Sequence, residues 1–332
     1  MPRTPLVVAA LGAASILVLA GCAPTNAGDG SAAGDGVTVV ASTNVYGQLA
    51  ETIGGDAVDV VSIIDSPTQD PHSYEPSARD QLTVSRADLV IENGGGYDPF
   101  VDALIEATGT TAPILTAVEF SPHWTGGSAH DDSAGDAHDG AADAHDGETD
   151  AHGHAHTAGF NEHVWYDLHT IDALAVAIAA ELEALRPADA ETFQANLAAL
   201  QEGLGELEAE VSAIADAHGG ARIFVTEPIP LWLTDEAGLV DATPAAFSQA
   251  VEEGQDVAPA TLLEALDLVR GGAVDLMIVN AQTGGAETEA VIAAAEDAGI
   301  PVLEFTETIP DGVTYVEWMQ DNISALADGL GG

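Results

Sequence analysis

Short apolar runs alternate with amphipathic stretches along most of this chain. Residues 37–42 and 58–64 are rich in valine and isoleucine, which is typical of buried strands. The same alternation of strands and helices continues toward residue 115, with a helix at 45–53, a helix at 76–86, a strand at 88–93, a helix at 99–107 and a strand at 113–115. Because strands that alternate with helices favour a parallel sheet, we predict an α/β lobe over residues 37–166.

The middle of the chain has a helical pattern without strands. Residues 167–185 form one apolar-periodic stretch, and Pro187 separates it from a second that covers 189–218 with apolar residues three and four positions apart. A helix of about 30 residues is long for a globular protein. We therefore predict that residues 167–218 are a helical linker between two lobes.

Strands and helices alternate again after residue 219. The predicted strands are 222–226, 274–279 and 301–305, and the predicted helices are 244–253, one after Pro259, 286–298 and one from about Tyr315. Residues 219–332 should therefore form a second α/β lobe. The predicted fold class is α/β, with two parallel-sheet lobes joined by a long helix.

The pattern is interrupted at residues 128–158. This segment repeats the sequence Asp-Ala-His every seven residues and has too few apolar residues to bury a core, so we predict a disordered surface insertion. Histidine-rich tracts commonly bind metal, and our hypothesis is that the segment collects metal weakly, the alternative being a merely acidic linker. Its histidines are His130, His138, His145, His152, His154 and His156.

The N-terminus has the pattern of a secretory signal. Residues 1–21 hold Arg3, an apolar run and small residues before Cys22, and the run is short for a membrane-spanning helix. Leu19-Ala20-Gly21-Cys22 matches the site that lipoprotein signal peptidase reads, so we expect a lipid on Cys22 and a flexible tether over 22–36. The protein should be extracytoplasmic and anchored to the membrane. Because Cys22 is the one cysteine, no intramolecular disulfide can form.

The composition is strongly acidic. The chain has 55 aspartates and glutamates against 6 lysines and arginines, a formal charge of -49. Nucleic acid is therefore not an expected partner, because phosphate binding needs clustered cations. The acidity could collect cations, or it could serve solubility alone.

Potential metal ligands occur in four segments that we expect to follow strands, where open α/β sheets bind ligands. They are His72 within residues 69–76, His163 within 161–166, Glu227 and Glu307. Imidazole and carboxylate groups both bind transition metals.

The chain resembles the zinc and manganese substrate-binding lipoproteins of bacterial ABC importers. The resemblance covers Val39 to Leu330, and its most specific pieces are Asp70-Pro71-His72-Ser73-Tyr74-Glu75-Pro76, residues 161–168 ending in Trp165-Tyr166-Asp167-Leu168, and Tyr315-Val316-Glu317-Trp318-Met319 with Asn322. It implies one metal between two lobes, with His72 and His163 from the first lobe and Glu227 and Glu307 from the second. It also implies a permease and its ATPase as partners, and we expect a monomer.

The resemblance leaves the metal open between Zn²⁺ and Mn²⁺. Many zinc-binding members have a histidine at the position of Glu227, whereas manganese-type members have a glutamate, yet zinc-type members also carry histidine-rich loops. Glu227 could instead cap a helix starting near Pro228, and Glu307 could be a solvated loop acid, with Glu304 misplacing the alignment. His72 could pack in its proline-flanked turn. We expect His123, His169 and His218 to be surface or helix-end residues.

Binding and delivery of a metal, without turnover, is the predicted function. One alternative is a surface adhesin or metal-scavenging lipoprotein that has no permease. The other is a secreted metallohydrolase, which the sequence disfavours because it contains no His-Glu-x-x-His, Gly-x-Ser-x-Gly or phosphate-loop motif. A long helical linker should also limit the lobes to small movements.

Overall fold

The computed structural model describes residues 36–69, 71–126 and 160–331. The predicted signal peptide, Cys22, the tether up to residue 35 and the insertion with its six histidines lie outside the described residues. No helix within the described ranges combines the length and the apolar character that crossing a membrane requires.

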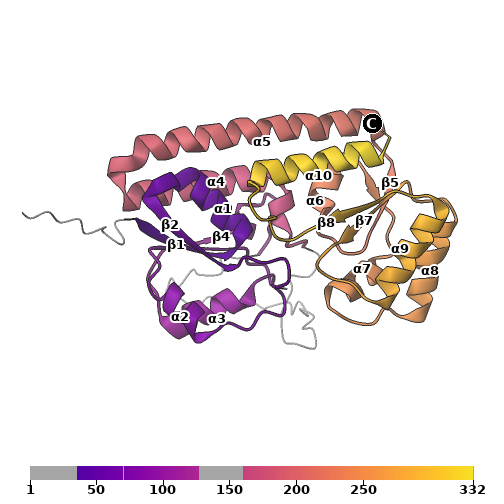
Figure 1. The fold of residues 1–332 in the computed structure, drawn as a ribbon, viewed down its shortest axis with the longest axis horizontal. Helices are drawn as coiled ribbons and strands as arrows, with labels where there is room; N and C mark the ends of the chain where they lie inside the picture. Colours follow the sequence, from indigo (N-terminus) through magenta and orange to yellow (C-terminus); the bar gives the residue numbers. More distant parts are fainter. Residues whose placement is uncertain (1–35, 70, 127–159, 332) are drawn as a thin grey trace, which may run out of the picture. The chain divides into compact units, whose positions relative to one another are not determined.

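The first lobe is built on a parallel four-stranded sheet in the order β2-β1-β3-β4. Its strands are β1 (Val37–Thr43), β2 (Val58–Ile64), β3 (Leu89–Glu92) and β4 (Ile114–Thr116). Its helices are α1 (Asn44–Gly54), α2 (Ala78–Val84) and α3 (Pro99–Thr108), with 3₁₀ turns η1 (Gly55–Ala57) and η2 (Ala117–Phe120). Figure 1 shows α1 and the pair α2 and α3 on opposite faces of this sheet.

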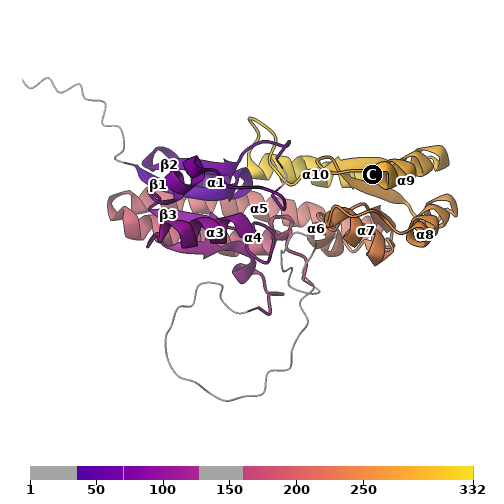
Figure 2. The same cartoon turned by 90° about the horizontal axis from the view of Figure 1, so that it is seen from below.

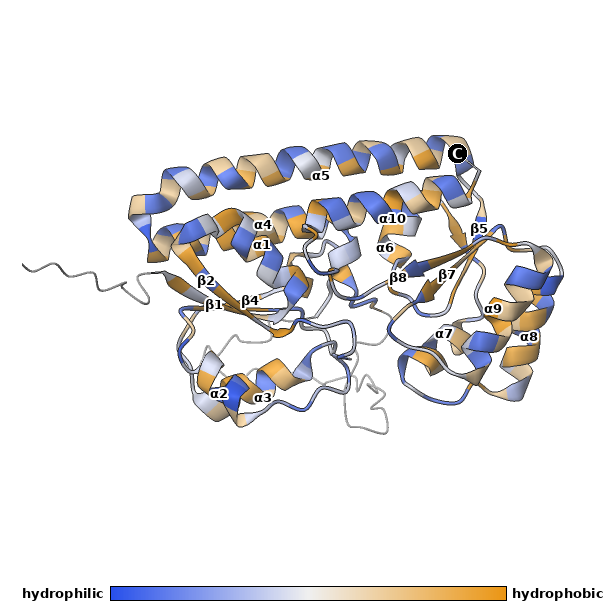
Figure 3. Cartoon of the chain, viewed as in Figure 1, coloured by the Kyte–Doolittle hydropathy of each residue, from blue (hydrophilic) through white to orange (hydrophobic). Residues whose placement is uncertain are grey.

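Burial on both faces explains the apolar sequence of β1. Val39 and Ala41 belong to the larger hydrophobic core with Leu49 of α1, whereas Val40 belongs to a smaller core with Val101 of α3. Successive side chains of a strand point to opposite faces, so a strand covered on both sides needs apolar residues at almost every position. Figure 3 shows these central strands as hydrophobic.

The second lobe repeats this plan with the strand order β6-β5-β7-β8, again parallel. Its strands are β5 (Arg222–Val225), β6 (Val240–Asp241), β7 (Leu276–Asn280) and β8 (Val302–Phe305). Its helices are α6 (Leu231–Glu236), α7 (Ala245–Glu252), α8 (Pro259–Arg270), α9 (Ala286–Ala298) and α10 (Tyr315–Gly329). The predicted α/β class with two parallel-sheet lobes is therefore confirmed.

Two helices connect the lobes through the turn η4 (Pro187–Asp189): α4 (Leu168–Leu185) and α5 (Ala190–His218). Helix α4 packs on α1 and β4 of the first lobe, and α5 contacts α1, α4, α6 and α10 (Figures 1 and 2). The buried face of α5 is a row from Phe193 to Ile214 at helical spacing.

One hydrophobic core extends through both lobes. It joins Val39 of the first sheet to Ile223 and Ile278 of the second by way of the buried row of α5. The described residues accordingly form a single compact unit. A continuous close-packed core resists large relative rotation of the two sheets.

Candidate metal centre

Both sheets have the topology that places ligands at the carboxyl ends of their central strands. In each sheet the first strand of the lobe lies inside the sheet, with the second strand on one side and the third on the other. The connections that follow the first and the third strand therefore run toward opposite edges of the sheet. Crevices at such switch points are the usual ligand sites of open α/β sheets. In the second lobe Glu227 follows β5 and Asn280 ends β7, and in the first lobe Tyr97 follows β3.

The two predicted histidine ligands lie together in the first lobe. His163 is completely buried, and its ring centroid is 6.2 Å from that of the half-buried His72. Tyr97 and Trp165 pack around them, with Tyr97 4.9 Å from His72 and Trp165 5.1 Å from His163. We had expected His163 to follow a strand directly. In the structure it instead precedes the 3₁₀ turn η3 (Val164–Tyr166).

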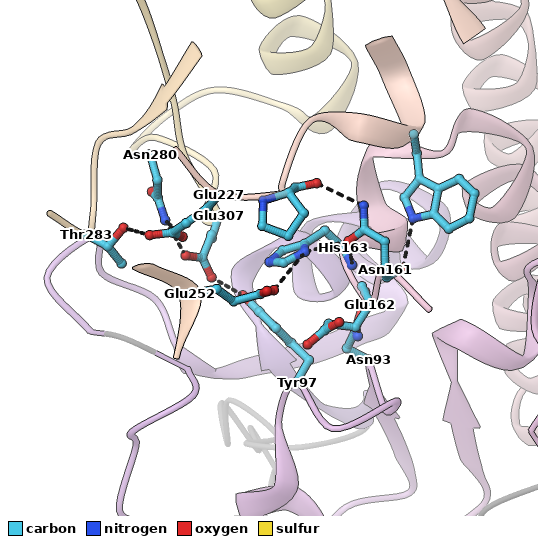
Figure 4. Close-up of polar contacts among 12 residues, drawn as sticks. Asn93, Tyr97, Asn161, Glu162, His163, Glu227, Glu252, Asn280, Thr283 and Glu307 are labelled. Carbon is cyan, nitrogen blue, oxygen red and sulfur yellow. Dashed lines mark hydrogen bonds and ion pairs between the residues drawn. The ribbon is translucent and has the colours of Figure 1, made fainter. Parts of the chain in front are cut away.

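Neutral donors hold the carboxylate of Glu227 at the end of β5. Glu227 is 3% exposed, its Oε2 accepts a hydrogen bond from the side chain of Asn280 at 2.6 Å, and its Oε1 accepts one from Thr283 (Figure 4). These donors orient the carboxylate without cancelling its charge.

Glu307 lies beside Glu227 and receives donors from both lobes. It is 1% exposed, and its Oε1 accepts from Asn280 at 2.7 Å. Its Oε2 accepts from the Tyr97 hydroxyl of the first lobe at 2.9 Å (Figure 4). Its backbone N–H donates to the side-chain oxygen of Gln282 at 2.6 Å, which fixes the loop after β8.

The structure brings the four predicted residues to one place between the lobes. His72, His163 and Glu307 each offer a ligand atom, and these atoms lie within 4.8 Å of one another. Glu227 adjoins them because one side chain, Asn280, donates to both carboxylates. Their role as ligands stays a prediction, and the six insertion histidines lie outside the described residues.

The alternative roles weighed for the two glutamates do not match their positions. Helix α6 begins at Leu231 after Pro230, so Glu227 is not at a helix start, and the helix expected near Pro228 begins later in the chain. Glu304 is exposed on β8, in contrast to the buried Glu307.

The three other histidines within the described residues are not part of this cluster. The side chain of His169 is 63% exposed, His218 is the last residue of α5, and His123 stacks on Trp232 with the ring centroids 4.9 Å apart. These positions fit the surface and helix-end roles expected for them.

Burial makes the negative charge of the site costly in the absence of a cation. Burial, and next the neighbouring Glu307, raise the pKa of Glu227 to about 7, although Thr283, Asn280 and His72 act in the opposite direction. Burial and then Glu307 raise the pKa of Tyr97 well above its ordinary value. A bound cation would favour the ionised carboxylates and so remove this cost.

A further acid near the site, the partly buried Glu252 at the end of α7, was not anticipated from the sequence. Its Oε1 lies 3.9 Å from Nδ1 of His163, and with Glu162 these residues form a second group whose possible ligand atoms lie within 4.8 Å (Figure 4). Burial, followed by Glu162, Glu227 and Glu307, raises the pKa of Glu252 well above its ordinary value. Glu252 precedes another glutamate at a helix end, a pattern typical of solvated surface, so the sequence offered no signal for it.

A cavity of about 590 Å³ reaches the cluster from the second lobe. Its lining includes His72, Glu227, Glu252, Asp256 and Glu287. An acid-lined cavity that ends at imidazole and carboxylate groups suits the passage of a hydrated cation.

Comparison with known proteins covers nearly the whole chain. Residues 39–329 match the model of the family described as zinc-uptake complex component A, periplasmic (ZnuA). The iron ABC transporter substrate-binding lipoprotein MtsA of Streptococcus pyogenes serotype M1 is 26% identical, and the manganese-binding lipoprotein MntA of Halalkalibacterium halodurans is 25% identical, each alignment covering 95% of both chains. The solved structure of the periplasmic zinc-binding protein TroA from Treponema pallidum has the same fold, with a TM-score of 0.69 at 18% identity over 90% of this chain and 100% of that one.

Proposed function

Because the chain belongs to the family of zinc-uptake complex component A periplasmic proteins, we propose that it is the substrate-binding component of an ABC importer for Zn²⁺ or Mn²⁺. One observation carries the proposal: two imidazoles and two buried carboxylates converge from different lobes, and neutral donors orient the carboxylates. The names of similar proteins mention iron, manganese and zinc. Because these names differ in the metal, the ligand atoms of the site are the guide to which metal this protein would carry. Two imidazoles and two carboxylates suit both Zn²⁺ and Mn²⁺.

The four residues would bind the metal without any chemical step. His72 and His163 would each give a lone pair as neutral imidazoles, and Glu227 and Glu307 would supply the negative charge that balances a divalent ion. Asn280 keeps both carboxylates aimed at one point while they repel each other. Four protein ligands close the coordination shell, and a closed shell serves binding rather than catalysis.

Only small movements of the lobes should accompany binding and release. Besides the shared core, side chains of the first lobe bond to the loop after β8: Asn44 exchanges two hydrogen bonds with the backbone of Ile309, at 2.8 and 3.0 Å, and Tyr166 donates to the carbonyl of Thr306 at 2.9 Å. Release to a partner therefore requires local rearrangement near the cavity more than rotation about a hinge.

The proposed partners are a membrane permease and its ATPase. A lipid on Cys22 and the tether over 22–36 would keep the loaded protein next to the permease, as a monomer on the outer side of the membrane. In this arrangement the anchor would hold the carrier close to the permease that receives the metal.

Titration of chelator-treated protein tests the proposal. We expect one equivalent of Zn²⁺ or Mn²⁺ to bind in isothermal calorimetry, with Zn²⁺ binding more tightly because it stands higher in the intrinsic affinity order of divalent metals. Mg²⁺ should bind far more weakly, because imidazole is a poor ligand for it. Absence of saturable binding of either transition metal would contradict the proposed function.

Metal affinity should fall as the pH is lowered from 8 to 6. Below its pKa of about 7 the metal-free Glu227 binds a proton that the metal must displace, so one such proton weakens binding by about tenfold for each pH unit below the pKa. For folding the effect has the opposite sign. Because the carboxyl pKa of Glu227 is raised in the folded metal-free protein, this group contributes stability that is fully present below its ordinary pKa of 4.5 and is lost as the pH rises from there to about 7. Zn²⁺ titrations at pH 8, 7 and 6 measure the effect, and affinity that is equal at all three would exclude a ligand of this pKa.

A further inference from the structure

Asn161 connects a proposed ligand of one lobe to the other lobe. Its side-chain nitrogen donates to the carbonyl of Pro228 at 2.9 Å, and its backbone carbonyl accepts from the indole N–H of Trp232 at 2.9 Å. Its side-chain oxygen accepts from the backbone N–H of His163 at 3.1 Å and lies 2.7 Å from Nδ1 of the same residue (Figure 4). Pro228 directly follows Glu227 in the chain.

These contacts fix the orientation of the Asn161 amide. A backbone carbonyl can only accept and a backbone N–H can only donate. The amide nitrogen must therefore face Pro228, and the amide oxygen must face His163. Two independent partners thus require the same orientation of the amide. With a single contact, the positions of its oxygen and nitrogen would only be an assignment.

The orientation of Asn161 decides which nitrogen of His163 carries the proton. The amide oxygen has no hydrogen, so Nδ1 of His163 has to donate to it at 2.7 Å. Glu252 lies 3.9 Å from the same nitrogen, which is beyond hydrogen-bond distance. In the neutral imidazole the lone pair is then on Nε2, the nitrogen that can bind a metal.

We infer that Asn161 is a positioning residue that holds His163 in the Nδ1–H tautomer, presents Nε2 to the cargo metal, and links this tautomer to the second lobe through Pro228. The inference deepens the proposed function and rests on it. A metal-binding histidine generally needs such a partner for its other nitrogen, because the partner fixes the ring and the tautomer. Here the partner also bonds to Pro228 of the second lobe, so this contact should improve the alignment of His163 with the carboxylates of that lobe.

Two substitutions separate the two parts of this role. Asn161→Asp keeps an oxygen that can accept from Nδ1 but removes the donor to Pro228, whereas Asn161→Ala removes both. In chelator-treated protein with ¹⁵N-labelled histidine, we expect the imidazole spectrum to show the Nδ1–H tautomer of His163 in the unchanged protein and in Asn161→Asp. Asn161→Ala should lose it, and comparison with His163→Ala assigns the signal. An Nε2–H tautomer in the unchanged protein, or an Nδ1–H signal that persists in Asn161→Ala, would overturn the inference.

Metal titration gives the second readout. Loss of the partner of a metal-binding histidine typically costs 10–100-fold in affinity, so Asn161→Ala should weaken Zn²⁺ binding by about that factor, and Asn161→Asp by less. Asn196→Ala is the matched control: Asn196 on α5 also bonds a backbone carbonyl, that of Ile53, at 2.9 Å but is remote from the site, and its loss should leave affinity unchanged.

The outcomes distinguish this inference from the proposed function. The tautomer is measured without metal, so the assignment of the tautomer can hold even if the protein binds no metal. In that case the proposed function fails and the tautomer assignment stands. If the unchanged protein binds one equivalent and Asn161→Ala binds equally well, the positioning role is wrong and the proposed function stands. Urea unfolding of each variant checks that a change in affinity does not reflect loss of the fold, and Asn161→Asp provides a reading should Asn161→Ala not fold.

Discussion

Replacing His163 by alanine should lower the affinity for Zn²⁺ by at least about 100-fold. The apparent free energy of binding of a four-ligand zinc site is about 10–16 kcal/mol, or roughly 3 kcal/mol for each ligand, and 1.4 kcal/mol corresponds to a tenfold change. His163 is completely buried beside His72 and Glu307, so water is poorly placed to take over its role. Competition titration with a chelator of known affinity measures the loss.

His169→Ala is the control for this variant. His169 lies near the start of α4, its side chain is 63% exposed, and its Nδ1 is 3.1 Å from Glu208, away from the cluster. We expect its replacement to leave zinc affinity within twofold of the unchanged protein. Equal affinity in the His163 and His169 variants would show that the metal binds elsewhere, with the histidine-rich segment 128–158 as the next place to examine.

Asn280→Asp should destabilise the metal-free protein by about 3–5 kcal/mol. The change removes two hydrogen bonds to carboxylates, each contributing about 1.5–3 kcal/mol, and places a third carboxylate between Glu227 and Glu307 where Asn280 is 4% exposed. A buried charge that has lost its partner typically costs 3–5 kcal/mol. Urea unfolding with a chelator present measures this difference in the free energy of unfolding.

Saturating Zn²⁺ should restore part of that lost stability, because the cation offsets the added charge and binds the folded state alone. Asn196→Asp is a suitable comparison, since it alters one hydrogen bond to a backbone carbonyl outside the site and should cost only about 1 kcal/mol. If Asn280→Asp proved no more destabilising than Asn196→Asp, Asn280 would not be the residue that holds the two carboxylates.

The strands and the longer helices could be predicted because burial imposes a pattern on them. Strand β1 is covered on both faces and the row on α5 is buried along its whole length, so both leave many apolar positions in the sequence. Helix α6 has 6 residues and strand β6 has 2, so neither contains enough positions to show a period. Strand β6 was missed for that reason, and α6 was expected only as a helix near Pro228, before its actual start at Leu231.

The site was predictable only where local sequence specifies position. Glu227 and Glu307 follow strands, and the segments with His72 and His163 resemble a known family. Asn280 also ends a strand, and its position at a switch point could have identified it. Tyr97 and Glu252 reach the site through packing. For Tyr97, Gly94 with a φ of 75° helps to turn the chain after β3. For Glu252, helix α7 lies far from His163 in sequence. Contacts between distant residues leave no periodic signal.

The core shared by both sheets has a consequence for the lifetime of the protein outside the cytoplasm. Because Val39, Ile223 and the buried row of α5 belong to one cluster, neither lobe should unfold without the other. A metal held by ligands from both lobes would then stabilise the whole folded body, in proportion to its concentration relative to its dissociation constant. Cleavage by proteases of transiently opened protein follows the free energy of opening. The amount of this protein that survives should therefore increase with metal supply, so that the carrier persists longest when it is loaded.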